Sequence, residues 1–156
     1  MTRVIIQGCS GRMGAALTEM AAQMKELEVV AGIDAISSDR PYPIYPSLAT
    51  CELEADVLID FSSPEALAQY GPVAKERDLA LVIATTGHND NQLTYIDTLS
   101  HTLPIFRSGN MSVGINLVQQ LVKEASKVLG DQYDVEIIER HHNQKKDAPS
   151  GTALML

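Results

Sequence analysis

Short apolar runs alternate with amphipathic stretches along most of the chain. The apolar runs predict buried strands at residues 3–8, 28–34, 55–62, 79–87, 103–108 and 133–142. Helical spacing of apolar residues predicts helices at residues 12–27, 63–78, 90–101 and 113–129. The alternation of strands and helices, with near-continuous apolar strands, predicts a parallel sheet covered by helices on both faces. The expected fold class is therefore doubly wound α/β.

Glycine and proline residues refine this pattern. Residues 37–47 contain three prolines and are expected to form a loop. The Gly71-Pro72 pair is expected to break or kink the second helix, and Gly130 is expected to close the long one. Residues 150–156 resemble the opening of another helix.

Ligands of such a sheet bind at the carboxyl ends of its strands. The first strand ends in a glycine-rich turn, "GCSGRMG", with Gly8, Gly11 and Gly14 in a variant of the usual dinucleotide spacing. Gly8 permits the tight turn, Gly11 lets a pyrophosphate approach the backbone, and Gly14 lets the helix lie close to the strand. The free N–H groups of the helix start would hold the phosphates, with Arg12 as an added cation. These features favour a Rossmann-type site over a purely structural turn.

Asp34 ends the second strand, 20 residues after Gly14, where an acid is expected to bind ribose hydroxyls. A carboxylate there favours a free 2′-hydroxyl and repels a 2′-phosphate. The following residue is Ala35, which cannot accept that phosphate. NADH is therefore the preferred cofactor and NADPH the alternative, which Arg40 would support if it folded back from its loop.

Composition excludes several other classes of function. The net charge of −8 disfavours nonspecific nucleic-acid binding, which depends on lysine and arginine. The longest apolar runs are strand length, so no membrane span is expected, and residues 1–20 lack the features of a signal peptide. Two cysteines are too few for a disulfide framework, which favours a reduced, cytoplasmic protein.

The segment "ERHHNQKKDAPSGTA" concentrates proton donors, cations and backbone amides. His141 and His142 titrate near neutral pH, and Lys145 and Lys146 can neutralise carboxylates. Ser150, Gly151 and Thr152 open a helix and offer N–H groups to an anion. The combination suits a small dianionic substrate that is protonated while it is reduced. A solvated polar loop is the alternative interpretation, and no Cys or carboxylate stands at a metal-ligand spacing, so no metal is expected.

The chain resembles the dihydrodipicolinate reductase family, which acts in the diaminopimelate route to lysine. The resemblance rests on the successive motifs "GCSGRMG", "DVLIDFSSPE", "IATTGH", "NMSVGINL" and "ERHHNQKKDAPSGTA". It implies that a nicotinamide dinucleotide reduces 4-hydroxy-tetrahydrodipicolinate, a cyclic dicarboxylate, between two domains of a homotetramer. Residues 1–109 would form the dinucleotide-binding domain. Residues 110–156 would form a connecting helix and the incomplete start of a smaller α+β substrate and oligomerisation domain.

The resemblance also implies roles for individual residues. His141 matches the proton donor, and Lys145 matches the catalytic lysine. The substrate carboxylates would be bound by His142, Lys145, Ser150, Gly151 and Thr152. The cofactor would be bound by Gly8, Gly11, Arg12, Met13, Gly14, Asp34, Phe61, Thr85, Thr86, Gly87 and Asn110.

The chain departs from the family pattern in three ways. Asn143 and Gln144 stand where basic residues are common, and Lys146 stands where an apolar residue is common. The family's chains also continue well beyond the last motif, so this chain is expected to be short of the full second domain. A dinucleotide-binding module without turnover is therefore the alternative function. A homoserine- or inositol-type dehydrogenase is a third possibility, which the last motif fits poorly.

Overall fold

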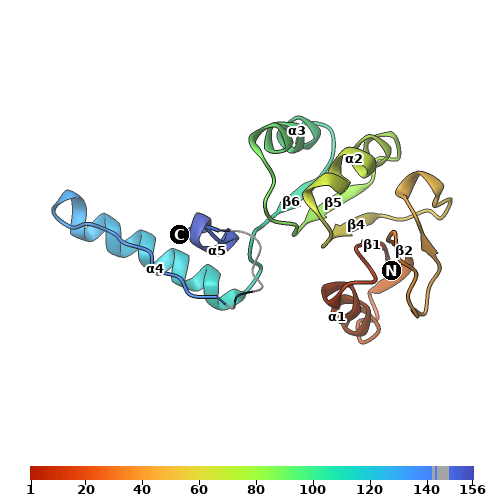
Figure 1. Cartoon of the computed structure of the whole chain (residues 1–156), viewed down its shortest axis with the longest axis horizontal. Helices are drawn as coiled ribbons and strands as arrows, with labels where there is room; N and C mark the ends of the chain where they lie inside the picture. Colours follow the sequence, from red (N-terminus) through yellow and green to blue (C-terminus); the bar gives the residue numbers. More distant parts are fainter. Residues whose placement is uncertain (142, 144–147) are drawn as a thin grey trace. The chain divides into compact units, whose positions relative to one another are not determined.

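Six parallel strands form the sheet that the apolar runs predict. The structure is a computed structural model and describes residues 1–141, 143 and 148–156. The strands are β1 Thr2–Gln7, β2 Leu27–Ile33, β3 Ile44–Tyr45, β4 Val57–Asp60, β5 Ala80–Ile83 and β6 Ile105–Arg107. Their order in the sheet is β3-β2-β1-β4-β5-β6 (Figure 1), and every pairing is parallel. The reversal of direction at β1 is the point where doubly wound sheets bind their ligands.

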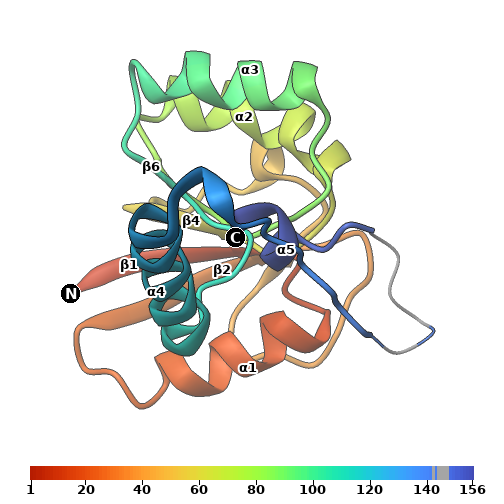
Figure 2. The same ribbon diagram turned by 90° about the vertical axis from the view of Figure 1, so that its left-hand side faces the viewer.

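Helices cover both faces of the sheet. The unit Met1–Arg107 contains α1 Arg12–Ala21, α2 Leu67–Glu76 and α3 Asp90–Ser100, with short 3₁₀ turns at Leu48–Thr50 and Pro64–Ala66. Figure 2 shows α2 and α3 on one face and α1 on the other. The strands are accordingly apolar on both sides: Ile5 packs in the core under α2 and α3, whereas Val4 and Ile6 pack in the core that includes Leu17 of α1.

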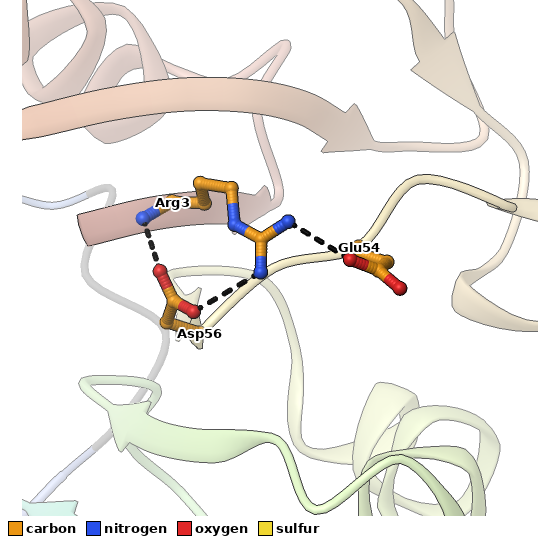
Figure 3. Close-up of polar contacts among 3 residues, drawn as sticks. All are labelled: Arg3, Glu54 and Asp56. Atoms are coloured by element: carbon orange, nitrogen blue, oxygen red, sulfur yellow. Dashed lines mark hydrogen bonds and ion pairs between the residues drawn. The ribbon is translucent and has the colours of Figure 1, made fainter. Parts of the chain in front are cut away.

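The amino ends of β1 and β4 are joined by ion pairs. The Arg3 guanidinium lies 3.1 Å from the Glu54 carboxylate and 3.3 Å from the Asp56 carboxylate (Figure 3). The Arg3 backbone N–H also donates to Asp56, and this bond and the Arg3 side chain lower the pKa of the Asp56 carboxyl. These groups are exposed, so the pairs fix the start of the two strands more than they stabilise the fold.

Several element boundaries differ from the sequence expectation. The first helix ends at Ala21, about a turn and a half early, because residues 22–26 form a turn that leads directly into β2. The proline-rich loop contains the short strand β3, which pairs with β2. Pro72 lies inside α2 without breaking it. The adjacent Gly71 lies against Tyr95 of α3, where an added Cβ would come within 2.9 Å of the Tyr95 ring.

In the second unit, Ser108–Leu156, the described regular secondary structure is all helical. It contains α4 Val113–Leu129, a 3₁₀ turn at Gly130–Gln132 and α5 Gly151–Met155. A strand was predicted at residues 133–142. The prediction is wrong for residues 133–141, which form no strand, and His142 lies outside the described residues. Alternating apolar residues form a strand only beside another strand, and here Val135, Ile137 and Ile138 are exposed. Among the described helices, none is long and apolar enough to cross a membrane.

Candidate functional site

A groove of about 410 Å³ lies at the carboxyl ends of β1, β2 and β4. Its lining is contributed by the glycine turn, the end of β2 and the start of α2: Gln7, Gly8, Gly11, Asp34, Ala35, Pro46, Phe61, Ser62, Ser63, Glu65, Ala66 and Gln69. A larger hollow of about 570 Å³ lies at the opposite, amino end of the strands, near Arg3 and Arg77. The groove is the candidate site, because it lies at the sheet's reversal point and contains the glycine turn.

Gly8 makes the sharp exit from β1. Its φ of +81° is a conformation that side-chain-bearing residues rarely adopt, and its N–H donates to the Ile33 carbonyl at 2.9 Å. A Cβ at this position would lie 2.6 Å from the Phe61 carbonyl oxygen. Glycine is therefore required here for the chain to pass between the ends of β2 and β4.

Gly11 and Gly14 have different roles. Gly14 is buried, and a Cβ on it would lie 2.5 Å from the Cys9 carbonyl oxygen, so the helix packs directly on the turn. Gly11 lines the groove and caps α1 without a side-chain hydrogen bond. The exposed first turn of α1, which begins with Arg12 and Met13, thus has backbone N–H groups that no capping side chain uses. This arrangement fits a pyrophosphate at the positive end of the helix dipole.

Asp34 lies on the β2 side of the groove. Its Oδ2 accepts a hydrogen bond from the Ser10 N–H at 3.0 Å, and its Oδ1 accepts one from the Ile36 N–H at 3.1 Å. Both bonds orient the carboxylate and tie it to the glycine turn. Each oxygen retains a further lone pair, so ribose hydroxyls can still donate to it.

Arg40 does reach back toward the glycine turn. Its Nε donates to the Cys9 carbonyl at 2.9 Å, and its Nη1 donates to the Asp39 carbonyl at 3.0 Å. The loop after β2 therefore brings both a carboxylate and a guanidinium to this turn. The spacing from Gly14 indicated Asp34 from the sequence. For Arg40 the only sequence signal was its position in the proline-rich loop after β2.

The end of β4 contains a buried carboxylate that the sequence reasoning did not single out. Asp60 is completely buried and accepts hydrogen bonds from the Ser62 N–H, the Ser62 hydroxyl and the Tyr70 hydroxyl. Burial, with the charge of Asp60, raises the pKa of the Tyr70 hydroxyl far above its ordinary value. The signal in the sequence was an acid at the end of an otherwise apolar strand, "VLID".

The loop after β5 carries Thr85, Thr86 and Gly87. The Thr85 hydroxyl is buried and accepts a hydrogen bond from the Ser62 N–H at 3.0 Å, which joins the ends of β4 and β5. Gly87 has a φ of +85° and turns the chain toward α3. Asn89 then begins α3 with a capping box that it forms with Gln92. Phe61 and this loop thus follow neighbouring strands, β4 and β5.

His88 follows that loop and has an unusual environment. Both ring nitrogens are buried, and neither has a hydrogen-bond partner within the described part of the chain. Burial lowers the pKa of His88, and so does the positive charge of Arg107, whereas the carboxylates of Asp60 and Glu65 act in the opposite direction. Burial therefore favours the neutral form of the imidazole.

This environment predicts a pH dependence of stability. Because the pKa of His88 is lower in the folded chain, its contribution is fully present above the unfolded value of about 6.5 and is lost as the pH falls below it. His88→Phe should therefore lose less stability than the wild type between about pH 7.5 and 5.5. Urea unfolding at both pH values measures this difference. Parallel losses in the two proteins would contradict it.

The second unit brings several predicted residues together. The Asn110 side chain donates to the Thr152 hydroxyl at 2.7 Å, and the Ser150 N–H donates to the Glu139 carboxylate at 2.9 Å. His141 Nδ1 lies 3.4 Å from the same carboxylate. Glu139 is therefore a shared partner of the predicted proton donor and of the α5 start. Glu139 is the first residue of the motif "ERHHNQKKDAPSGTA", but the sequence alone indicates no role for it.

Two predicted residues, His142 and Lys145, lie outside the described residues, as does Lys146. The remaining substrate-side positions open α5. The Ser150 hydroxyl accepts a hydrogen bond from the Ala153 N–H at 3.1 Å and thus acts as the N-cap of this helix, with Gly151 as its first residue.

Comparison of the chain with known proteins identifies its family. The family description "Dihydrodipicolinate reductase, N-terminus" matches residues 2–111, and "Dihydrodipicolinate reductase, C-terminus" matches residues 114–156. The 4-hydroxy-tetrahydrodipicolinate reductase of Caldanaerobacter subterraneus subsp. tengcongensis is 49% identical over 156 residues, which are 100% of this chain and 62% of that protein. The chain thus spans less than two thirds of the length of this curated relative.

Solved structures agree with the assignment. A dipicolinate-bound dihydrodipicolinate reductase from Paenisporosarcina sp. TG-14 is 29% identical, with a TM-score of 0.76, and the match covers 99% of this chain and 63% of that one. The myo-inositol 2-dehydrogenase of Lactobacillus plantarum shares the fold alone. It is 12% identical, with a TM-score of 0.60, and the match covers 80% of this chain and 42% of that one. With both family descriptions matched in order along its length, the chain belongs to the dihydrodipicolinate reductase family.

Proposed function

We propose that this chain takes part in the reduction of 4-hydroxy-tetrahydrodipicolinate to tetrahydrodipicolinate by NADH or NADPH, a step of diaminopimelate and lysine biosynthesis. The observation that carries the proposal is the groove, where the glycine turn, the α1 start and Asp34 converge. Family membership and the dipicolinate bound to the Paenisporosarcina relative support the substrate class. The cofactor would supply the hydride, and the protein would bind and protonate the substrate.

The cofactor would lie with its pyrophosphate on Gly11 and the first turn of α1, next to Arg12 and Met13. Asp34 would bind the adenosine ribose, which is the reason to prefer NADH. The nicotinamide half would extend to the ends of β4 and β5, where Phe61 and the loop residues 85–87 lie. From the family resemblance, we also propose Asn110 as a cofactor-binding residue.

His141 would donate the proton that accompanies the hydride. Its Nδ1 is next to Glu139, so Nε2 is the nitrogen that we expect to deliver the proton. Lys145 would supply the catalytic cation and, with His142 and residues 150–152, would bind the substrate carboxylates. We further propose that the complete protein is a cytoplasmic homotetramer, as the family resemblance implies.

A dinucleotide-binding module without turnover is the second candidate. It is favoured by the location of the groove, whose described lining lies entirely within the first unit, Met1–Arg107. Turnover separates the two functions. A chimera of this chain with the unmatched part of the Caldanaerobacter relative should oxidise NADH in the presence of the substrate. A folded chimera that binds NADH without oxidising it would favour the second candidate.

Lys145→Ala in this chimera should weaken binding of pyridine-2,6-dicarboxylate by about tenfold to a hundredfold, because a charge-assisted hydrogen bond is lost. Turnover should fall with it. Lys123→Ala on α4 is the matched control, since it removes the same charge from an exposed helical position. Calorimetric titration measures the binding. If Lys145→Ala behaved like the control, Lys145 would have no place in the mechanism.

A further inference from the structure

Asp60 is buried beneath the groove at the end of β4. It is 0% exposed, and among the described residues it forms no salt bridge. Ser62, which lines the groove, donates to Oδ1 through both its N–H, at 3.0 Å, and its hydroxyl. Tyr70 donates to Oδ2 from the core side at 3.0 Å. Ser62 therefore separates the Asp60 carboxylate from the groove and is hydrogen-bonded to it.

A negative charge in this position is expensive. Burial of a carboxylate without a cation costs free energy, which the three donated hydrogen bonds only partly offset. An asparagine has nearly the same shape and can accept the two Ser62 hydrogen bonds without carrying the charge. Hydrogen bonding alone therefore does not account for an aspartate here. The charge itself points to an electrostatic role at the groove.

The sheet order indicates which part of the cofactor this charge faces. The glycine turn follows β1, and Asp34 lies on the β2 side of it, so the adenosine half occupies that side. The other half of a dinucleotide must then extend across β1 toward β4 and β5. Ser62 and Thr85, which a hydrogen bond joins, each come two residues after the end of one of these strands. Asp60 thus lies under the region expected to hold the nicotinamide.

We propose that Asp60 is a positioning residue whose buried charge, held under the groove by Ser62, favours the oxidised over the reduced nicotinamide ring. This inference rests on the proposed function. In hydride transfer the C4–H bond of the ring breaks, and both of its electrons pass with the hydrogen to the substrate carbon. The substrate is reduced, and the neutral ring is oxidised to a cation. A fixed negative charge nearby stabilises that cation and so promotes hydride donation.

The test compares the affinities of the chain for NAD⁺ and NADH by calorimetry. Asp60→Asn should raise the ratio of the NAD⁺ Kd to the NADH Kd by about fivefold to tenfold, because only the oxidised ring carries the positive charge. If Asp60 had a merely structural role, Asp60→Asn would weaken the binding of NAD⁺ and of NADH equally. An unchanged ratio would overturn the inference while leaving the proposed function intact. A wild-type chain that binds neither form would overturn both.

Two control variants isolate the charge. Asp56→Asn removes the same charge at the opposite end of β4 and should leave the ratio unchanged. Tyr70→Phe removes a hydrogen bond to Asp60 but keeps the charge, so any loss should affect both forms alike. If Asp60→Asn does not fold, the double variant with Tyr70→Phe replaces it, because phenylalanine has no hydroxyl that requires a partner. A ratio that rose equally in Asp56→Asn would also overturn the inference.

Discussion

Gly14→Ala is expected to destabilise the chain by about 3 kcal/mol or more, because the new methyl group overlaps the turn backbone. The Cβ would lie 2.5 Å from the carbonyl oxygen of Cys9 and 2.6 Å from its Cα, and neither atom can move without moving the end of β1. Inside a helix, glycine to alanine ordinarily stabilises by about 1 kcal/mol. The expected effect therefore has the opposite sign from helix propensity.

Gly11→Ala is the matched control. Its Cβ would be 3.4 Å from the Gly8 carbonyl oxygen, which is ordinary contact, and its φ of −73° suits alanine. Its stability should remain near that of the wild type, while NADH binding weakens by about tenfold because the methyl group enters the groove. Urea unfolding and NADH titration of both variants separate the two effects. Equal stability of Gly14→Ala and Gly11→Ala would contradict this account of the turn.

His141→Gln is expected to lower the turnover of the chimera by about a hundredfold to a thousandfold, because general acid catalysis contributes at this scale. The Kd for NADH should change little, since the histidine is assigned to the substrate and not to the cofactor. Glutamine keeps a polar group near Glu139 but cannot supply an acidic proton.

His101→Gln provides the control for this experiment. His101 is an exposed histidine at the end of α3, far along the chain from the last motif, and turnover should be unaffected there. Steady-state kinetics together with NADH titration checks both variants. Equal losses of turnover and cofactor affinity in His141→Gln would remove His141 from its role as proton donor.

The strands and helices of the first unit could be predicted because their patterns are local. Each central strand is a run of apolar residues bounded by turn residues, and both the glycine spacing and Asp34 follow from one strand-turn-helix unit. The short strand β3 could not be predicted in this way. Its two residues, Ile44 and Tyr45, lie among prolines, and their pairing with β2 depends on the whole loop.

The wrong strand prediction at residues 133–141 has a related cause. "DVEII" has the alternation of a half-buried strand, but a strand also needs a neighbour for its backbone hydrogen bonds, and sequence pattern alone does not provide one. The local sequence pattern favoured a strand, but no neighbouring strand pairs with these residues in the described part of the chain. Residues 113–129 were predictable as a helix because α4 satisfies its backbone groups within itself.

The motifs of the candidate site could be predicted from the sequence, but the hydrogen bonds that join them could not. The Ser10 N–H to Asp34 bond, the Arg40 contact with Cys9 and the Tyr70 hydroxyl to Asp60 bond join residues that are 24, 31 and 10 positions apart. No periodicity encodes such contacts, because they depend on loop conformations. Glu139 is the exception, since an acid two residues before His141 was visible in the quoted motif.

Calorimetric titration of the chain with NADH, alone and with pyridine-2,6-dicarboxylate, is the decisive test of the proposed function. We expect NADH to bind, and its affinity to increase when the dicarboxylate is present, because the cofactor and the substrate mimic would bind at the same time and next to each other. NADH binding that does not respond to the dicarboxylate would indicate a cofactor-binding module without a substrate site. A folded chain that failed to bind NADH at all would contradict the account.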